Sequence, residues 1–392
     1  MPRLTPLAKI FITLVILGTV GYVMYSRREE AWARLYARTA PSVPLKADLP
    51  RFPDATDEVP SRVPLALPGV TPGCAQLVEV RMLEMAWNAQ AGLNYANGGT
   101  QATAGSLMCT EGVNLKIARQ DSTDAMQTEL IAFAEALHTG KEHPIKGVHF
   151  VNIMGDGAPA FLAALNGQLS KLGPDYTAEI IGAVGRSYGE DALLGPPSWF
   201  KNPLNARGSL IAGVLRDGDW NIAMKWMHDN SDDSDPTRQL CNNPDEKTYD
   251  PDCVNWVAAA DFLDAPAKYN ANYCEKRAVV RNGKRTGEVR NVCVNAVVTW
   301  TPGDVNIAKG RGGLTRIVST REYSAQMPVT IIGIKKWNKD NRGVVVGLLK
   351  AAFDGGALVR SNSVARQHAM VINSRIFGEQ TGAWWDTYYL EI

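Results

Sequence analysis

The sequence predicts an α/β protein with mostly parallel sheets, preceded by one N-terminal transmembrane helix. Strand-like runs alternate with helical patterns beyond residue 72, and the stretch 10–25 (IFITLVILGTVGYVMY) contains no charged residue. The composition of the 392 residues, 45% hydrophobic and 21% charged, excludes a disordered, collagenous or multi-span chain. The net charge of +1 and the lack of a Lys/Arg run argue against nucleic-acid binding.

Residues 1–28 are expected to form a cytoplasmic stub and a transmembrane signal anchor. The uncharged stretch is close to the roughly 20 residues that cross a bilayer, and residues 25–28 (YSRR) are a poor cleavage context. A cleavable signal peptide remains the alternative. The arginines that follow the span favour the opposite orientation by the positive-inside rule, so charge alone leaves the orientation open.

Residues 29–72 are expected to form a proline-rich tether, after a short helical stretch at 29–38. Pro41, Pro44 and six further prolines fall between residues 41 and 72. Proline fixes φ and removes a hydrogen-bond donor, which favours an extended tether over a packed element. A loop lying over the domain surface is an equally good interpretation of its second half.

The six cysteines predict three disulfides. Cys274 and Cys293 flank a hairpin that turns at Asn282-Gly283, and Cys241 and Cys253 bracket a loop of little apolar content, which leaves Cys74 and Cys109 as the third pair. Disulfides indicate an oxidising compartment, and we therefore expect an inner-membrane, single-pass protein with its main domain in the periplasm. Six buried free thiols are the alternative.

Strands and helices then alternate along the chain. We expect strands at 77–82, 113–117, 148–154, 178–184, 210–215, 294–300, 315–318 and 329–334, and helices at 124–138, 158–172, 220–229 and from 342 to 353 and onward. Residues 121–123 supply a helix cap, and Gly173-Pro174 end the second helix. Such sheets bind ligands where loops leave the carboxyl ends of the strands.

Three loops of that kind combine glycine with polar groups. Their candidate ligand-binding residues are Asp156 and Gly157, then Asp217, Asp219 and Trp220, then Thr299, Trp300 and Asp304. An equally good interpretation of each aspartate is that it caps the following helix. The recurrence of the pattern favours one shared cleft.

The charges of these loops favour a neutral polar or amine-bearing organic ligand. Carboxylates at helix starts repel an anion, although the loop with Arg186, Ser187 and Tyr188 is the best anion candidate. Stacking faces are expected from Trp87, Tyr188, Trp220 and Trp300, with core packing an equal alternative for Trp220. The acidic stretch 232–252 lacks EF-hand spacing and is expected to be a solvated loop, so neither a metal nor a cofactor is predicted.

Two motifs resemble a known family in their order along the chain. Residues 87–93 (WNAQAGL) with 112–115 (GVNL), and later 296–302 (AVVTWTP), resemble type II periplasmic solute-binding proteins of ABC transporters, in the branch for nitrate, sulfonates and thiamine precursors. Residues 313–333, with Met327-Pro328, continue the pattern. The set is also similar to phosphate-type substrate-binding proteins fused to OmpA-like domains, although no OmpA-like region is recognised in this sequence.

The resemblance implies two lobes joined by a hinge, with Trp87, Asn88 and Gln90 at the ligand site. We assign residues 73–185 to the first part of lobe 1, 186–298 to lobe 2, and 299–392 to the return into lobe 1 and a C-terminal helical segment.

The predicted function is a membrane-anchored solute-binding protein that captures a small polar organic ligand for an ABC-type permease or for sensing. The alternative is an envelope scaffold with other cell-envelope partners, which keeps the fold without transport. An enzyme is not expected, because the sequence has no G-x-S-x-G, H-E-x-x-H or Walker A motif.

Overall fold

A computed structural model describes residues 69–392 except 233, 379–380 and 391–392. The predicted signal anchor and almost all of the predicted tether lie outside the described residues. Within the described part of the chain, every helix is too short or too polar to cross a membrane.

The first sheet has the strand order β2-β1-β3-β14-β4. Its strands are β1 (Glu79–Glu84), β2 (Asn114–Arg119), β3 (Phe150–Met154), β4 (Ala178–Arg186) and β14 (Pro328–Ile334). β1 is parallel to β2 and β3, but β14 is antiparallel to both β3 and β4. The sheet is therefore mixed rather than mostly parallel, because β14 enters it from the far end of the chain in the opposite direction.

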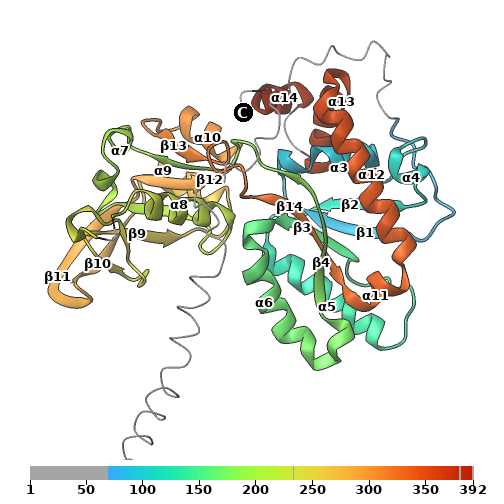
Figure 1. The fold of residues 1–392 in the computed structure, drawn as a ribbon, viewed down its shortest axis with the longest axis horizontal. Helices are drawn as coiled ribbons and strands as arrows, with labels where there is room; N and C mark the ends of the chain where they lie inside the picture. The colour runs from blue at the N-terminus through green and yellow to red at the C-terminus, as the bar shows by residue number, and fades with distance from the viewer. Residues whose placement is uncertain (1–68, 233, 379–380, 391–392) are drawn as a thin grey trace, which may run out of the picture. The chain divides into compact units, whose positions relative to one another are not determined.

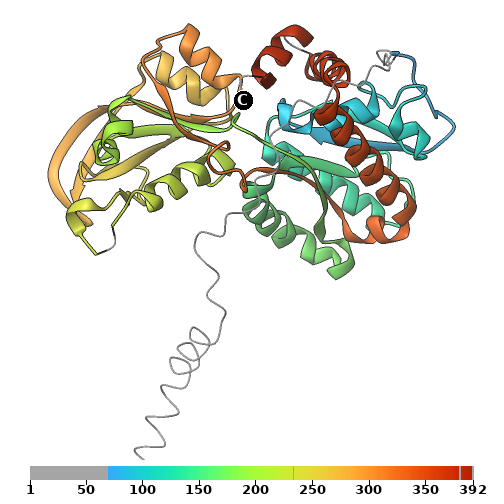
Figure 2. The same ribbon diagram turned by 45° about the horizontal axis from the view of Figure 1, so that its top comes forward.

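Helices cover both faces of the first sheet (Figures 1 and 2). α5 (Thr123–His138) and α6 (Ala158–Leu169) lie on one face, and α3 (Ala91–Asn97), α12 (Arg342–Ser361) and α13 (Ser363–Phe377) lie on the other. α4 (Leu107–Thr110), α11 (Lys335–Asp340) and α14 (Gly382–Leu390) are shorter. α3 packs closely against α12 because Gly92 faces Gly356: a Cβ on Gly92 would lie 2.5 Å from the Cα of Gly356.

The second sheet has the order β13-β5-β12-β6-β9-β7. Its strands are β5 (Ala192–Gly195), β6 (Leu210–Gly213), β7 (Cys241–Asn242), β9 (Cys253–Ala258), β12 (Ala296–Thr299) and β13 (Thr315–Ser319). Strand β5 is antiparallel to β12 and β13, and the other pairs are parallel. The short helix α7 (Ser198–Lys201) follows β5.

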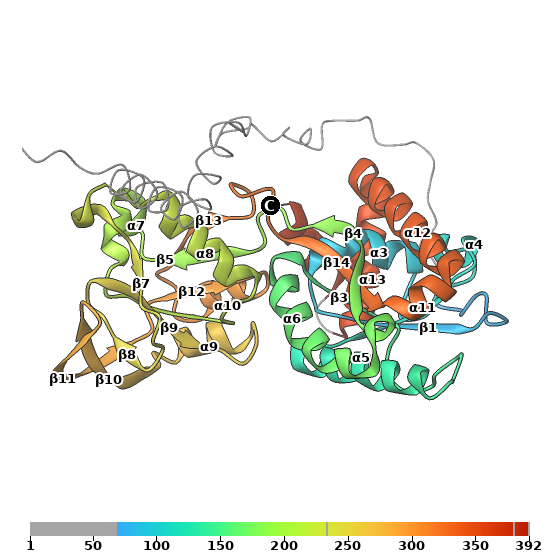
Figure 3. The ribbon, with the colours of Figure 1, turned by 60° about the horizontal axis from the view of Figure 1, so that its bottom comes forward.

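Both faces of this sheet are buried, which explains its uninterrupted apolar strands. Leu193, Ile211 and Val298 pack in the cluster that contains the apolar face of α8 (Gly218–Asp229). Their neighbours Leu194, Ala212 and Val297 pack with α9 (Asp264–Asn270) and α10 (Gly303–Lys309) on the opposite face. Figure 3 shows α8 and α9 beside these strands.

Two segments, 187–191 and 320–327, connect the sheets, so the chain crosses between them twice. We call the first sheet with its helices lobe 1 and the second, residues 192–319, lobe 2. The sequence placed the return to lobe 1 at residue 299, whereas β13 pairs with β5 and keeps the chain in lobe 2 to Ser319. The two crossing segments are bonded to each other: the hydroxyls of Ser187 and Thr320 lie 2.7 Å apart, and the Thr320 amide donates to the Asp191 carbonyl over 3.0 Å.

The predicted hairpin and all three predicted disulfides are confirmed. β10 (Cys274–Arg281) and β11 (Lys284–Cys293) pair so that Cys274 lies directly opposite Cys293, and β8 (Thr248–Tyr249) completes a three-stranded sheet. Asn282 and Gly283 have φ of 50° and 71°, the left-handed turn that this dipeptide favours. The other disulfides join Cys74 to Cys109 and Cys241 to Cys253.

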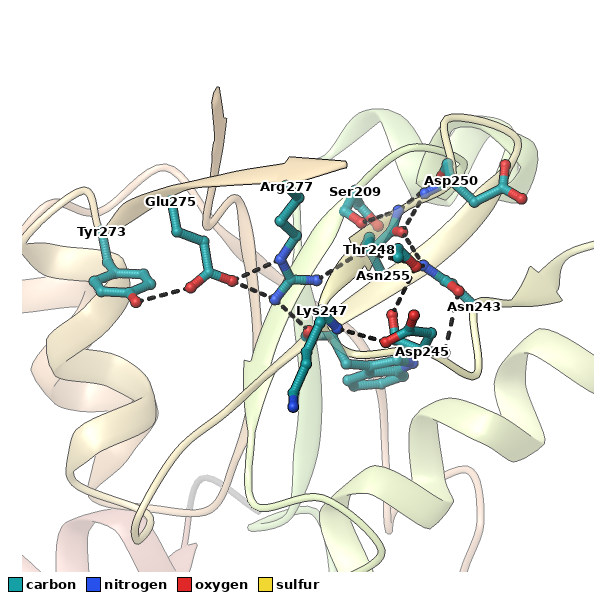
Figure 4. A network of polar contacts seen from close by, with 11 residues as sticks. Ser209, Asn243, Asp245, Lys247, Thr248, Asp250, Asn255, Tyr273, Glu275 and Arg277 are labelled. Carbon is teal, nitrogen blue, oxygen red and sulfur yellow. Dashed lines mark hydrogen bonds and ion pairs between the residues drawn. The ribbon is translucent and has the colours of Figure 1, made fainter. Parts of the chain in front are cut away.

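A buried polar network orders the stretch between Cys241 and Cys253 (Figure 4). The Asn255 amide donates to the carbonyls of Ser209 (3.1 Å) and Asp250 (2.8 Å), and Asn243 donates to Asn255 over 3.0 Å. Arg277, 3% exposed, donates to the Trp256 carbonyl over 2.7 Å and to Glu275. Hydrogen bonds between buried polar groups therefore order this stretch, which lacks an apolar core.

Removing a disulfide is expected to lower the free energy of unfolding according to the length of the loop it closes. We expect a loss of about 4 kcal/mol for Cys74→Ser with Cys109→Ser and about 3 kcal/mol for Cys241→Ser with Cys253→Ser, because the longer loop gains more chain entropy when released. Urea unfolding of both double variants measures the difference. A larger loss for the Cys241–Cys253 pair would show that the network of Figure 4 depends on that bridge.

Candidate ligand-binding site

Loops from both lobes border a shallow hollow, whose volume is about 340 Å³ when the open solvent within it is included. Lobe 1 contributes residues after β1 and β2, and lobe 2 contributes residues after β6, β9 and β12. The polar walls are Asp121 and Asp124 of lobe 1 and Asp217 and Asp261 of lobe 2; the apolar walls include Met85, Phe262 and Trp300. The hollow therefore lies at the carboxyl ends of strands in both sheets, where α/β proteins bind ligands.

Direct contacts join the lobes beside this hollow. The Trp300 indole N–H donates to the Ala86 carbonyl over 3.2 Å, and the Asn221 amide donates to the Asp156 carbonyl over 3.0 Å. Gly157 lies so close to Asp217 that a Cβ there would be 2.3 Å from Oδ1. The predicted residues Asp156, Gly157, Asp217 and Trp300 are thus brought together from two sheets.

Asp217 is the N-cap of α8 and accepts the Gly218 amide over 2.8 Å, so the helix-capping interpretation also holds for it. Burial raises the pKa of both Asp217 and Asp156, and the charge of Asp156 raises the pKa of Asp217 further. Asp156 also accepts the Met327 amide over 3.1 Å. This bond ties the loop after β3 to the second crossing segment.

A second group of carboxyls is buried behind Asp217. Asp191, 0% exposed, accepts the Trp87 indole N–H over 3.2 Å, and its carboxyl interacts with that of Asp219. Burial raises the pKa of Asp191 to about 7 and raises the pKa values of Asp219 and Glu190 well above their usual range. One oxygen each of Glu190, Asp191 and Asp219 is buried without a hydrogen-bond partner.

The remaining predicted residues of the crossing and of lobe 2 have structural partners. Arg186 donates to the Ser324 carbonyl over 2.6 Å and lies over the Tyr188 ring, while Ser187 bonds to Thr320. The buried Thr299 hydroxyl donates to the Phe262 carbonyl over 3.3 Å. Asp304 pairs with Arg316 at 3.0 Å near Glu190.

Of the fourteen residues predicted to bind the ligand, only Asp217 and Trp300 line the hollow. Trp220 borders a different hollow of about 230 Å³ within lobe 2 and packs against Trp256, with ring centroids 6.0 Å apart. Asn88 and Gln90 turn into the interior of lobe 1, where Asn88 accepts from Asn373 over 3.1 Å and Gln90 accepts from Asn152 over 3.0 Å.

That interior also contains Glu84, which is 0% exposed. Burial raises its pKa to about 8, and the amides of Asn94 and Asn152 lower it only in part. Neither carboxylate oxygen has a well-formed hydrogen bond. Glu84 is therefore neutral at pH 7 and costs stability when it ionises.

The sequence interpretation missed several of these residues. Glu190 and Asp191 directly precede β5, an apolar strand that the sequence patterns did not predict. Asp261 and Phe262 follow β9, another strand that they did not predict. The rule of polar groups after the carboxyl ends of strands identifies Asp261 once β9 is recognised, but it does not identify Glu190 and Asp191, which precede β5, or the apolar Phe262. Glu84 had no comparable signal, because its burial depends on distant packing.

Among the described residues, no group of three or more His, Cys, Asp or Glu side chains is arranged to hold a metal ion. Asp245 and Asp250, from the acidic stretch, instead accept the amides of Lys247 and Asp252, each over 2.9 Å.

No family model matches the chain, and no curated protein sequence matches it. Solved structures similar to it include the periplasmic aliphatic sulphonate-binding protein SsuA from Escherichia coli, with 14% identity, a TM-score of 0.48, and coverage of 80% of this chain and 83% of that one. The periplasmic nitrate-binding protein NrtA from Synechocystis PCC 6803 has 11% identity, a TM-score of 0.49, and coverage of 78% and 68%. A ligand-binding component of an ABC-type import system from Staphylococcus aureus has 9% identity, a TM-score of 0.48, and coverage of 79% and 82%.

The raised pKa of Glu84 predicts that Glu84→Gln flattens the pH dependence of stability. In the unfolded chain Glu84 ionises near pH 4.5, but in the folded protein it stays protonated to about pH 8, so wild-type stability falls between these values by up to about 1.4 kcal/mol per pH unit. Glutamine does not ionise and removes this fall. Melting temperatures measured from pH 5 to 9 test the prediction.

The exposed Glu135→Gln on α5 is the matched control and should follow the wild type. If Glu84→Gln also follows the wild type across the whole range, Glu84 is not a buried neutral acid.

Proposed function

We propose that the chain is a membrane-anchored extracytoplasmic solute-binding protein that captures a small polar organic ligand between its two lobes. The observation that carries the proposal is the hollow at the carboxyl ends of strands from both sheets, which is bordered by two aspartates from each lobe. Asp217 and Trp300 are the predicted binding residues at its wall.

Two further observations support the cellular placement. The three disulfides are typical of an oxidising compartment, which favours the periplasm. The uncharged stretch 10–25 of the sequence favours an inner-membrane anchor. Delivery of the ligand to an ABC-type permease, or sensing of it, is the role that such a tethered binding protein would have.

The two crossing segments support a hinge. Lobes joined by two short segments rotate about them when ligand contacts exist only in the closed form. The hydroxyl of Thr320 is hydrogen-bonded to the Ser187 hydroxyl and accepts the Gly189 amide, and these bonds hold the two segments side by side.

An envelope scaffold is the second candidate, and the cross-lobe contacts favour it. Trp300 to Ala86, Asn221 to Asp156, and Gly157 against Asp217 already fix the lobes to each other. A scaffold protein, whose lobes do not open and close, would keep these contacts permanently.

A solute panel measured by thermal shift on the full chain distinguishes the two functions. A solute at about 100 times its Kd adds about 2.7 kcal/mol to the free energy of unfolding. We expect at least one small polar solute to raise the melting temperature. If none of the anionic, neutral or cationic solutes does so, the scaffold function is favoured and the solute-binding proposal fails.

Trp300→Phe is expected to weaken binding of a solute found in this way. The substitution keeps an aromatic wall but removes the indole N–H that donates to Ala86 in the other lobe. Loss of one such bond costs about 1 kcal/mol, or about fivefold in Kd. Calorimetric titration measures it, with Trp220→Phe, in the other hollow, as the control that leaves Kd unchanged.

A further inference from the structure

Two acidic side chains at the entry to lobe 2 accept hydrogen bonds from lobe 1. Glu190 and Asp191 directly precede β5, and the Thr301 amide of lobe 2 donates to the Glu190 carbonyl over 3.2 Å. Their side chains turn to the other lobe. The Trp87 indole N–H donates to the Asp191 carboxyl over 3.2 Å. The Ala89 amide donates to the Glu190 carboxyl, so the two acids bridge the lobes.

A third carboxyl, that of Asp219, joins them from the first turn of α8 in lobe 2 and interacts with the carboxyl of Asp191. All three acids are no more than 4% exposed, and one oxygen of each has no hydrogen-bond partner. A buried acceptor without a donor costs free energy, and an ionised one costs more. Separation of the lobes would break the bonds from Trp87 and Ala89 and admit water to these oxygens.

The neighbouring elements oppose ionisation of these acids. Their charged groups near the cluster are Asp156 after β3, Asp217 at the start of α8, Asp304 of α10 and Arg316 of β13. Arg316 is paired with Asp304 at 3.0 Å, which offsets its positive charge. Burial, assisted by repulsion from the other acids, raises the pKa values of Glu190 and Asp219 well above their usual range.

We propose that Glu190, Asp191 and Asp219 form a proton-dependent latch, which holds the lobes together while these acids are protonated and releases them when the acids ionise. The inference rests on the hinge of the proposed function but needs no ligand. Protonated carboxyls tolerate burial against lobe 1, whereas ionised carboxyls are stabilised by the water that reaches them when the lobes separate.

The direction of the pH effect follows from proton binding. With the lobes together, burial raises the pKa of Asp191 to about 7, whereas a hydrated aspartate has the ordinary pKa of 3.8. Between these values the separated form binds fewer protons, so raising the pH favours separation by up to about tenfold per pH unit for each acid. From pH 5 to pH 8, Asp191 alone is expected to raise the ratio of separated to closed lobes by about a hundredfold.

The distance between spin labels on the two lobes measures this equilibrium. All six cysteines are paired in disulfides, so two introduced cysteines are labelled specifically. Ile145→Cys in lobe 1 and Val289→Cys in lobe 2 replace side chains that are 85% and 63% exposed. In the full chain without added solute, we expect the distance distribution to change between pH 5 and pH 8 while circular dichroism stays constant.

Glu190→Gln, Asp191→Asn and Asp219→Asn each remove one ionisation and keep the shape of the side chain. Each is expected to make the change with pH less steep, and the triple variant is expected to keep the pH 5 distribution up to pH 8. If the triple variant does not fold, the single variants make the same test. Glu84→Gln is the matched control, because Glu84 is a buried acid inside lobe 1 and its loss should leave the change as in the wild type.

A distribution that is the same at pH 5 and pH 8 in the wild type overturns the latch. A change with pH that the three latch variants leave unaltered, that Glu84→Gln abolishes, or that accompanies a loss of circular dichroism also overturns it, because the signal then has another origin. Solute binding is tested separately by the thermal-shift panel, so failure of the latch leaves the solute-binding function intact.

Discussion

The approach of Gly157 to Asp217 is the contact on which the candidate site depends. Gly157 follows β3 of lobe 1, and Asp217 caps α8 of lobe 2, so this one contact brings the strand ends of both sheets together. Any side chain at 157 would overlap the Asp217 carboxylate, 2.3 Å from its Cβ. The hollow opens beside Asp217 because the backbone of the other lobe comes this close.

The buried carboxyls near this contact lower the stability of the folded protein. Asp191, Asp219 and Glu190 are buried with unsatisfied oxygens, and burying such groups costs free energy that packing elsewhere must offset. The indole N–H of Trp87 reduces this cost by donating to Asp191. Buried carboxyls that strain the fold in this way are more common at functional sites than in structural cores.

Local patterns in the sequence predicted much of the fold. The helix at 123–138, its Ser122 cap and the Asn282-Gly283 hairpin depend on neighbouring residues, and the Cys274–Cys293 bridge follows from the register that the turn sets. The antiparallel entry of β14 and the continuation of lobe 2 to Ser319 depend on pairing between distant strands, which periodicity does not encode. Asn88 and Gln90 were placed by resemblance to a motif, yet their side chains face the interior.

Asp191 lies where the two crossing segments contact each other. Asp191 ends the first crossing segment, and its backbone carbonyl accepts the amide of Thr320 in the second. Its side chain pairs with Asp219, on which the charge of Asp217 acts in turn. The three carboxyls of Asp191, Asp219 and Asp217 therefore connect the first crossing segment to the wall of the hollow.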